Sequence, residues 1–247
     1  MVYQQTLEKL YALKLQGLAQ AYQEQQQQTQ ITDLNFDERL ALLIERQWLW
    51  RENRALATRL TYAHLKLNAC LEDLDYRHPR GLHRATLEQL ATGEWIRQHQ
   101  TCLITGPTGT GKSFISSALA NRACRLGYRA LYYYLPKLFR ELSLAQADGS
   151  LTALLKKLAK VDLLVLDDWG LTPLLPDHYR LFLELLDDRQ GTGATLITSQ
   201  YPLSAWHKLI EDPTIADALL DRLIHHAHKL ELKGESLRKK TAAKGDK

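Results

Sequence analysis

The chain has 247 residues, of which 45% are hydrophobic and 24% charged, a composition typical of a globular protein with room for one α/β domain and a smaller module. No apolar run approaches the ~20 residues that span a bilayer, and charges interrupt the apolar pattern of the first residues, which excludes a signal peptide. The three cysteines lack C-x-x-C spacing and are expected to be reduced thiols. We therefore expect a cytoplasmic protein without a membrane partner.

The net charge of +4 is unevenly distributed along the chain. Residues 39–66 carry six basic and two acidic side chains, and residues 233–247 show the same excess. Two local basic zones of this kind indicate an anionic partner.

The first 70 residues have the periodicity of helices. Leucines recur at helical spacing over residues 1–30, and a second helical pattern runs from about residue 36 to 64. Asp33, Asn35 or Asp37 is in position to cap the second helix. We expect a small all-helical N-terminal domain over residues 1–70, which binds DNA or a partner protein, and a second domain over residues 71–247 with a basic tail.

After residue 100 the sequence alternates between short apolar runs and helical segments. This alternation is typical of an α/β domain, in which helices flank both faces of a parallel sheet. A fifth strand at 228–232 would complete a five-stranded sheet, and only about 15 residues follow it. The other expected strands are TCLIT at 101–105, ALYYYL at 130–135, DLLVLD at 162–167 and ATLITS at 194–199.

The sequence GPTGTGKS fits the phosphate-binding loop pattern G-x-x-x-x-G-K-[ST], directly after a strand and before a helix. Glycines let the backbone approach a phosphate, successive N–H groups surround it, and the helix N-terminus adds positive potential. A glycine-rich turn with a chance lysine is the alternative, which this context disfavours. The residues expected to bind ATP are Gly106, Pro107, Thr108, Gly109, Thr110, Gly111, Lys112 and Ser113.

Two aspartates end the apolar run LLVLDDWG. Asp167 lies at the carboxyl end of an expected central strand, where open α/β sheets bind ligands. In P-loop NTPases such an aspartate holds Mg²⁺ together with the loop Ser or Thr, which here is Ser113. Asp168 would then lie near the γ-phosphate and orient or deprotonate a water. The alternative for Asp168 is a turn or helix cap.

Several segments resemble the IstB-like transposition helper family of AAA+ ATPases, which is related to the DnaC-type helicase loaders. They are RLALLIERQWLWREN at 39–53, GEWI at 93–96, GPTGTGKS, LLVLDDWG, ATLITSQYP at 194–202 and DPTIADALLDRLIHHAHKLELKGESLRK at 212–239. The resemblance implies an AAA+ core without a C-terminal lid domain. It also implies a homo-oligomer that binds ATP and duplex DNA and recruits or stimulates the transposase of an insertion sequence.

The resemblance also implies roles for single residues. Ser199 and Gln200 match the polar sensor of the γ-phosphate, although a strand-end turn is the alternative. Arg222 matches the arginine finger that completes a neighbouring subunit's site, with an ion pair to Asp217 or Asp221 as the alternative. Arg238 matches a second phosphate sensor or belongs to a solvated basic arm. Asp168 replaces the glutamate of many AAA+ proteins, so we expect slow hydrolysis.

Two groups of basic residues are candidates for contacts with DNA phosphates. One lies on the helix expected at 36–64, where the side chains do not share one face and some could cover apolar surface with their stems. The other lies in the segment 136–160, expected to form two helices broken at residues 148–149, which could equally be ordinary crossover helices. The candidates are Arg46, Arg51, Arg54, Arg59, Arg140, Lys156 and Lys157.

Two other functions remain open on the sequence. A DnaC-like helicase loader would share the fold and use the N-terminal module to hold a helicase. A small-molecule P-loop kinase would need an acceptor pocket and an arginine-bearing lid, and no such lid is recognisable.

Overall fold

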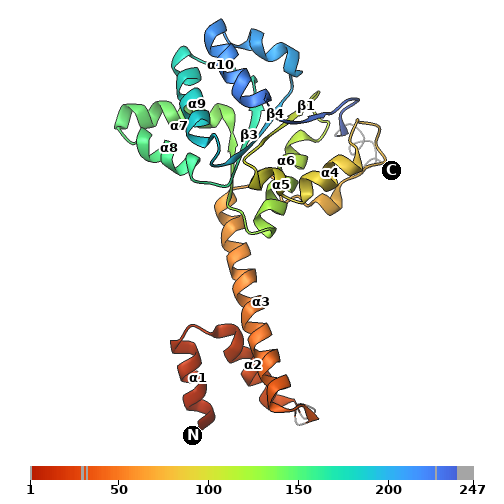
Figure 1. Cartoon of the computed structure of the whole chain (residues 1–247), viewed down its shortest axis with the longest axis vertical. Helices are drawn as coiled ribbons and strands as arrows, with labels where there is room; N and C mark the ends of the chain where they lie inside the picture. The colour runs from red at the N-terminus through yellow and green to blue at the C-terminus, as the bar shows by residue number, and fades with distance from the viewer. Residues whose placement is uncertain (1, 29–30, 32, 226, 238–247) are drawn as a thin grey trace, which may run out of the picture. The chain divides into compact units, whose positions relative to one another are not determined.

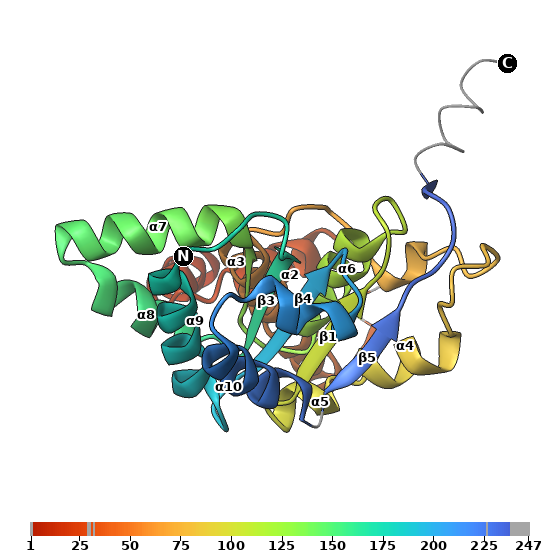
Figure 2. The ribbon, with the colours of Figure 1, turned by 90° about the horizontal axis from the view of Figure 1, so that it is seen from above.

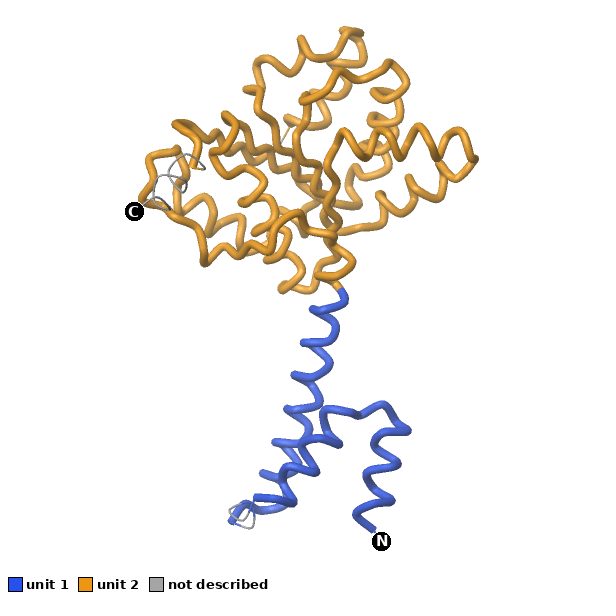
Figure 3. The backbone as a smooth tube through the Cα atoms, turned by 180° about the vertical axis from the view of Figure 1, so that it is seen from behind, with its two compact units in different colours: residues 1–58 blue, residues 59–247 orange. Residues whose placement is uncertain are grey.

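The computed structural model describes residues 2–28, 31, 33–225 and 227–237. By their internal contacts the residues fall into two compact units, 1–58 and 59–247, which Figure 3 colours separately. The division precedes the boundary at residue 70 expected from the sequence because helix α3 (Phe36–Ala63) is continuous, and its last residues belong to the second unit.

The first unit consists of α1 (Val2–Ala12), α2 (Gln16–Gln27) and most of α3. The single helix expected over residues 1–30 is two helices, because Lys14 adopts a left-handed φ of 59° between them. α2 packs closely on α3: a Cβ at Gly17 would lie 2.6 Å from Trp50 Cβ. The Leu18 amide also donates to Gln47 Oε1 at 3.0 Å.

Helix α3 begins with reciprocal hydrogen bonds between Asn35 and Glu38. The Glu38 amide donates to Asn35 Oδ1 at 3.0 Å, and the Asn35 amide donates to Glu38 Oε2 at 2.9 Å. These bonds satisfy backbone donors that the first turn leaves open. Of the three caps considered from the sequence, the structure uses Asn35.

The second unit is built on a five-stranded sheet of order β2-β3-β4-β1-β5, and Figure 2 shows β3, β4, β1 and β5 side by side. Each neighbouring pair is parallel, which confirms the expected topology, including the fifth strand. The strands are β1 (Thr101–Thr105), β2 (Ala130–Tyr134), β3 (Leu163–Trp169), β4 (Ala194–Ser199) and β5 (His228–Glu231).

Helices cover both faces of this sheet (Figures 1 and 2). Leu103, Leu164 and Ile197 pack on one face against α7 to α10, while their strand neighbours point to the face contacted by α6. This two-sided burial explains why the strands read as continuous apolar runs. The helices are α4 (Arg84–Ala91), α5 (Glu94–Arg97), α6 (Lys112–Arg125), α7 (Leu135–Asp148), α8 (Leu151–Ala159), α9 (Pro176–Arg189) and α10 (Pro213–Ile224), with 3₁₀ turns η2 (Leu71–Asp73) and η3 (Leu203–Leu209).

A β-bulge interrupts the pairing of β3 with β4 next to the carboxyl end of the sheet. Leu166 pairs with Ile197 and Trp169 pairs with Ser199, so that Asp167 and Asp168 lie in the bulge. Asp168 has a φ of +68°, a left-handed conformation that Asp tolerates better than most residues. Bulges re-aim side chains, and this one presents two carboxyl groups at the sheet end.

The segments around this core match most of the remaining expectations. The insert between β2 and β3 is the helix pair α7 and α8, broken at Gly149, whose φ is +80°. After β5, residues 232–237 contact the loop at 106–111 and contain no helical lid, as far as the structure describes this part of the chain. Among the described helices, none combines the length and apolar character required to cross a bilayer.

Candidate nucleotide-binding site

The phosphate loop connects β1 to α6 through residues 106–111. Gly111 has a φ of +98° and lies directly before the first residue of α6, Lys112. This left-handed backbone favours glycine, and a Cβ there would lie 2.6 Å from Arg80 Nη1, so that the Arg80 side chain would have to shift. The loop therefore delivers the N-terminus of a 14-residue helix to the carboxyl end of the sheet.

Arg80 stabilises the backbone of this loop, a role that was not predicted from the sequence. Its side chain is buried; Nη1 donates to the Thr110 carbonyl at 3.0 Å and Nη2 to the Asp75 carbonyl at 3.0 Å. Because these bonds tie the loop to the preceding connector, Arg80 restrains the backbone that would surround a phosphate. A lone arginine after Pro79 gives no sequence signal for this role.

Lys112 is buried within the loop, with its ammonium directed at loop carbonyls. Its Nζ donates to the Gly106 carbonyl at 2.7 Å and to the Pro107 carbonyl at 2.9 Å. The structure thus places a positive charge among the backbone groups expected to hold the β- and γ-phosphates, as the sequence pattern predicts.

Asp167 is fully buried and surrounded by donors. Its carboxylate accepts hydrogen bonds from Ser113 Oγ at 2.8 Å, Thr198 Oγ1 at 2.6 Å, Lys66 Nζ at 2.7 Å and the Tyr132 hydroxyl. Burial is the largest influence on the pKa of Asp167 and alone would raise it, but the hydrogen bonds, led by that from Lys66, outweigh burial and lower the pKa. The buried group is therefore a carboxylate at neutral pH.

The oxygen atoms at this position fit a magnesium ion. A serine hydroxyl and an aspartate carboxylate are hard oxygen donors of the kind that Mg²⁺ binds beside substrate phosphates. They lie together at the carboxyl end of the sheet, and the Lys66 ammonium already contacts both, at 2.7 Å from Asp167 and 3.4 Å from Ser113. The position thus attracts a cation, and Ser113 and Asp167 would hold the metal.

Asp168 lies beside this cluster, partly exposed. Its carboxylate is 3.8 Å from Lys66 Nζ, and the neighbouring Gln200 side chain acts to lower its pKa. Burial, followed by the negative charge of Asp167, raises the pKa of Asp168 above its ordinary value, in the direction that improves a general base. Gln200 also receives a hydrogen bond from Thr108 Oγ1 at 2.7 Å, so it connects the phosphate loop to Asp168.

Ser199, one of the two residues that match the sensor, does not direct its side chain into this cluster. Its buried hydroxyl donates to the Trp169 carbonyl at 2.9 Å and accepts from the Tyr201 amide at 3.1 Å, as a strand-end turn requires. Thr198 faces the site instead: besides bonding Asp167, its Oγ1 accepts the Asp168 amide at 3.0 Å. Asp167 lies beside Thr198 because Leu166 pairs with Ile197, and the bulge that follows keeps Asp168 beside Thr198 as well. The sequence reveals neither the register nor the bulge.

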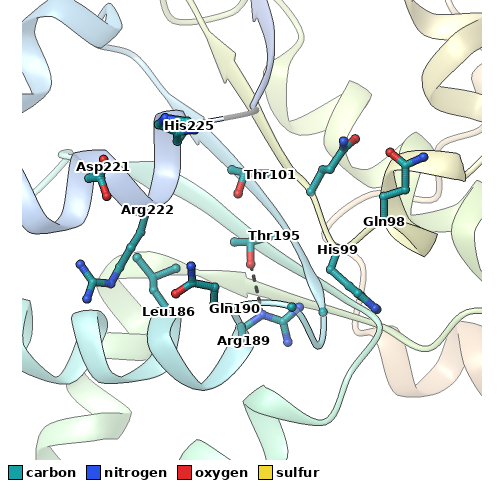
Figure 4. A pocket seen from close by; sticks show the side chains of 13 residues that line it. Gln98, His99, Thr101, Leu186, Arg189, Gln190, Thr195, Asp221, Arg222 and His225 are labelled. Carbon is teal, nitrogen blue, oxygen red and sulfur yellow. Dashed lines mark hydrogen bonds between the residues drawn. The ribbon is translucent and has the colours of Figure 1, made fainter.

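Arg222 lies at the other end of the sheet, on α10, where it lines a cavity of about 530 Å³ (Figure 4). Its Nε donates to the Asp187 carboxylate on α9, so its ion-pair partner is neither Asp217 nor Asp221. The cavity is also lined by Thr101, the first residue of β1, and by Thr195, the second residue of β4. The phosphate loop follows the last residue of β1, about 13 Å away along the strand at ~3.3 Å per residue.

The family model "IstB-like ATP binding protein" matches residues 8–245. The chain belongs to this family. A putative insertion sequence ATP-binding protein of Sinorhizobium fredii is 48% identical over 95% of this chain and 96% of its own length. A putative ATP-binding protein of the insertion sequence IS1162 from Pseudomonas fluorescens is 46% identical, over 83% of this chain and 89% of its own length.

The fold of this chain is similar to that of several solved structures. A crystal structure of DnaI has a TM-score of 0.58 at 24% identity, covering 67% of this chain and 91% of that one. The DnaC helicase loader has a TM-score of 0.58 at 20% identity, covering 67% and 97%. The expected fold, an AAA+ ATPase core with a helical N-terminal part, is therefore confirmed for this IstB-like protein.

The candidate second sensor of this IstB-like protein, Arg238, lies outside the described residues. The residues just before it reach the phosphate loop: the Leu237 amide donates to the Gly109 carbonyl at 2.9 Å, and a Cβ at Gly109 would collide with Ser236.

Of the basic residues that are candidates for DNA contacts, some interact with other residues of the chain and others are exposed to solvent. Arg46 pairs with Glu24 at 3.0 Å, and Arg59 Nε donates to the Cys124 carbonyl at 2.9 Å. Arg54 is exposed and lies over the Trp50 ring. The remaining candidates are exposed: Arg51, Arg140, Lys156 and Lys157.

Proposed function

We propose that this protein is the ATP-dependent helper of an insertion sequence, which assembles into a homo-oligomer on duplex DNA and recruits or stimulates the transposase. One observation carries the oligomer: Arg222 and the phosphate loop lie at opposite ends of the same sheet. One copy cannot direct its Arg222 at its own nucleotide, whereas a second copy can offer this arginine to the first.

In this proposal ATP binds to residues 106–113, and Mg²⁺ is held by Ser113 and Asp167. Asp168 accepts the proton of the attacking water, and Gln200 links Asp168 to Thr108 of the phosphate loop. When bound, the metal supplies positive charge to the phosphates. The base is an aspartate, whose side chain is shorter than that of glutamate, and it lies on a bulge. Both features support slow ATP hydrolysis.

DNA as a partner is supported by the relatives and by charge. The relatives are named for insertion sequences, which are DNA elements. Exposed arginine and lysine side chains make sequence-independent contacts to phosphates. Those that remain available on α3 and on the α7–α8 pair are Arg51, Arg54, Arg140, Lys156 and Lys157.

A further partner is supported by apolar side chains exposed on α3. Ile44 is 55% and Trp48 58% exposed, an unusual state for large apolar residues on one helix. We assign these apolar side chains to contacts with a protein, either the transposase or a second copy. A helicase-loader function rests on the shared fold alone, and the family match disfavours a small-molecule kinase.

Sedimentation velocity of the full-length protein tests the proposal. We expect a monomer or small oligomer without ligand, and a larger species with Mg²⁺, a non-hydrolysable ATP analogue and duplex DNA. Because phosphate contacts release counterions, DNA binding should weaken steeply, about tenfold or more per doubling of salt if several phosphates are contacted.

The control is an Arg51→Ala/Arg54→Ala double variant, which removes two exposed cations without touching the ATP site. It should retain ATP binding and show a shallower salt dependence. A monomer under all conditions, or DNA binding that does not respond to salt, would contradict the proposal.

A further inference from the structure

Lys66 belongs to the basic zone at 39–66, which was expected to contact an anionic partner. In the structure its ammonium instead contacts the carboxylates of the candidate nucleotide-binding site. Its ammonium lies 2.7 Å from Asp167 Oδ2, 3.4 Å from Ser113 Oγ and 3.8 Å from Asp168 Oδ2. It also lies 5.6 Å from the centre of the Tyr134 ring. All four partners belong to the same compact unit as Lys66.

The oxygens that Lys66 contacts are those proposed to bind the metal. Mg²⁺ binds its ligands at about 2.0–2.1 Å and demands near-octahedral geometry. The Lys66 ammonium, hydrogen-bonded to Asp167 and within reach of Ser113, lies against the oxygens that would hold the metal. Two cations at one carboxylate also repel each other strongly in a poorly solvated site. Lys66 and Mg²⁺ therefore exclude each other.

The position of Lys66 in the chain allows it to leave. Helix α3 ends at Ala63, His64 has a left-handed φ of 48°, and Lys66 follows in a non-helical segment. Its side chain is 38% exposed, whereas that of Asp167 is fully buried. The lysine can thus move toward solvent while Asp167 stays fixed by Thr198 and Tyr132.

We propose that Lys66 competes with the metal for its site: without nucleotide its ammonium neutralises the Asp167 carboxylate, and it must leave before Mg²⁺ can complete ATP binding. Lys66 then sets the metal concentration at which the site fills. This inference rests on the magnesium site of the proposed function.

The test uses Lys66→Met, which keeps the length of the side chain and removes its charge, with Lys208→Met as the matched control on the exposed surface of the same unit. Mn²⁺ serves as a paramagnetic probe of the metal site, measured by electron paramagnetic resonance with a non-hydrolysable ATP analogue. Lys66→Met should bind Mn²⁺ about tenfold more tightly, since the competing charge is gone, and Lys208→Met should match the wild type. Equal or weaker Mn²⁺ binding by Lys66→Met would overturn the proposal.

A second measurement needs no variant. Acetylation of lysine amines in the wild-type protein, read by mass spectrometry, should increase at Lys66 when Mg²⁺ and the analogue are added, with Lys208 as internal reference. Unchanged or reduced labelling of Lys66 would mean that the amine stays in the site, and would overturn the proposal. If the wild type binds neither analogue nor Mn²⁺, the proposed function fails as well; if it binds both and Lys66 does not respond, only the role of Lys66 fails.

Discussion

Replacing Arg222 with alanine should slow ATP hydrolysis by the DNA-bound assembly by about 10³-fold, the lower end of the effect of removing an arginine finger. The physical reason is that Arg222 would stabilise charge on the phosphates bound by a neighbouring copy. Because the side chain is part of a surface ion pair with Asp187, its removal should leave folding and ATP binding intact. Steady-state phosphate release and binding of a fluorescent ATP analogue measure the two quantities.

Mixed assemblies give the sharper test of a finger that acts between copies. Arg222→Ala copies keep an intact phosphate loop, and Lys112→Ala copies keep an intact Arg222. Mixing the two inactive variants should restore part of the hydrolysis, since some interfaces then combine both intact parts. Arg180→Ala, an exposed arginine on α9, is the matched control and should hydrolyse ATP normally. Failure of the mixture to recover any activity would contradict the assignment of Arg222.

Replacing Asp168 with asparagine should slow hydrolysis by about 10²- to 10³-fold, within the range for loss of a general base, while ATP binding is unchanged. Asparagine accommodates the left-handed φ of +68° at least as well as aspartate, so the bulge should survive. The substitution removes the carboxylate that accepts a proton from water. The asparagine side chain keeps the size of aspartate and still forms hydrogen bonds. Single-turnover hydrolysis separates this effect from ATP binding.

The pH profile provides a second reading of Asp168. Since its pKa is raised, a proton occupies the carboxylate at higher pH than for an ordinary aspartate, and wild-type hydrolysis should decline as pH falls through that pKa. Asp168→Asn should lose this acidic limb. Asp177→Asn, an exposed aspartate on α9, should keep both the rate and the limb. A normal rate in Asp168→Asn, or weakened ATP binding, would contradict the assignment.

The fold was predictable because its signals are local. Each strand of the sheet is a short apolar run, and the phosphate loop is one contiguous segment whose glycines, lysine and serine have fixed spacing. Asp167 could be assigned because it ends such a run. None of these assignments requires knowledge of which distant residues meet.

The rest of the site depends on contacts between distant segments. Lys66 reaches Asp167 across 101 positions of sequence and Arg80 reaches Thr110 across 30, with no pattern to mark either. Thr198 rather than Ser199 faces Asp167 because β3 and β4 pair with Leu166 opposite Ile197, which places Thr198 next to Asp167. Arg59 looked like a phosphate contact by its charge, but its guanidinium is held by the Cys124 carbonyl.

Calorimetric titration of Mg²⁺-ATP into the full-length protein tests the central claim most directly, with Lys112→Ala and Lys208→Ala as paired variants. The wild type and Lys208→Ala should bind one ATP per chain in a magnesium-dependent manner. Lys112→Ala should bind about ten- to hundredfold more weakly, the cost of losing a charge-assisted hydrogen bond of ~1.5–3 kcal/mol. Absence of binding heat in a folded wild-type protein, or unchanged affinity in Lys112→Ala, would contradict a nucleotide held between the phosphate loop and Asp167.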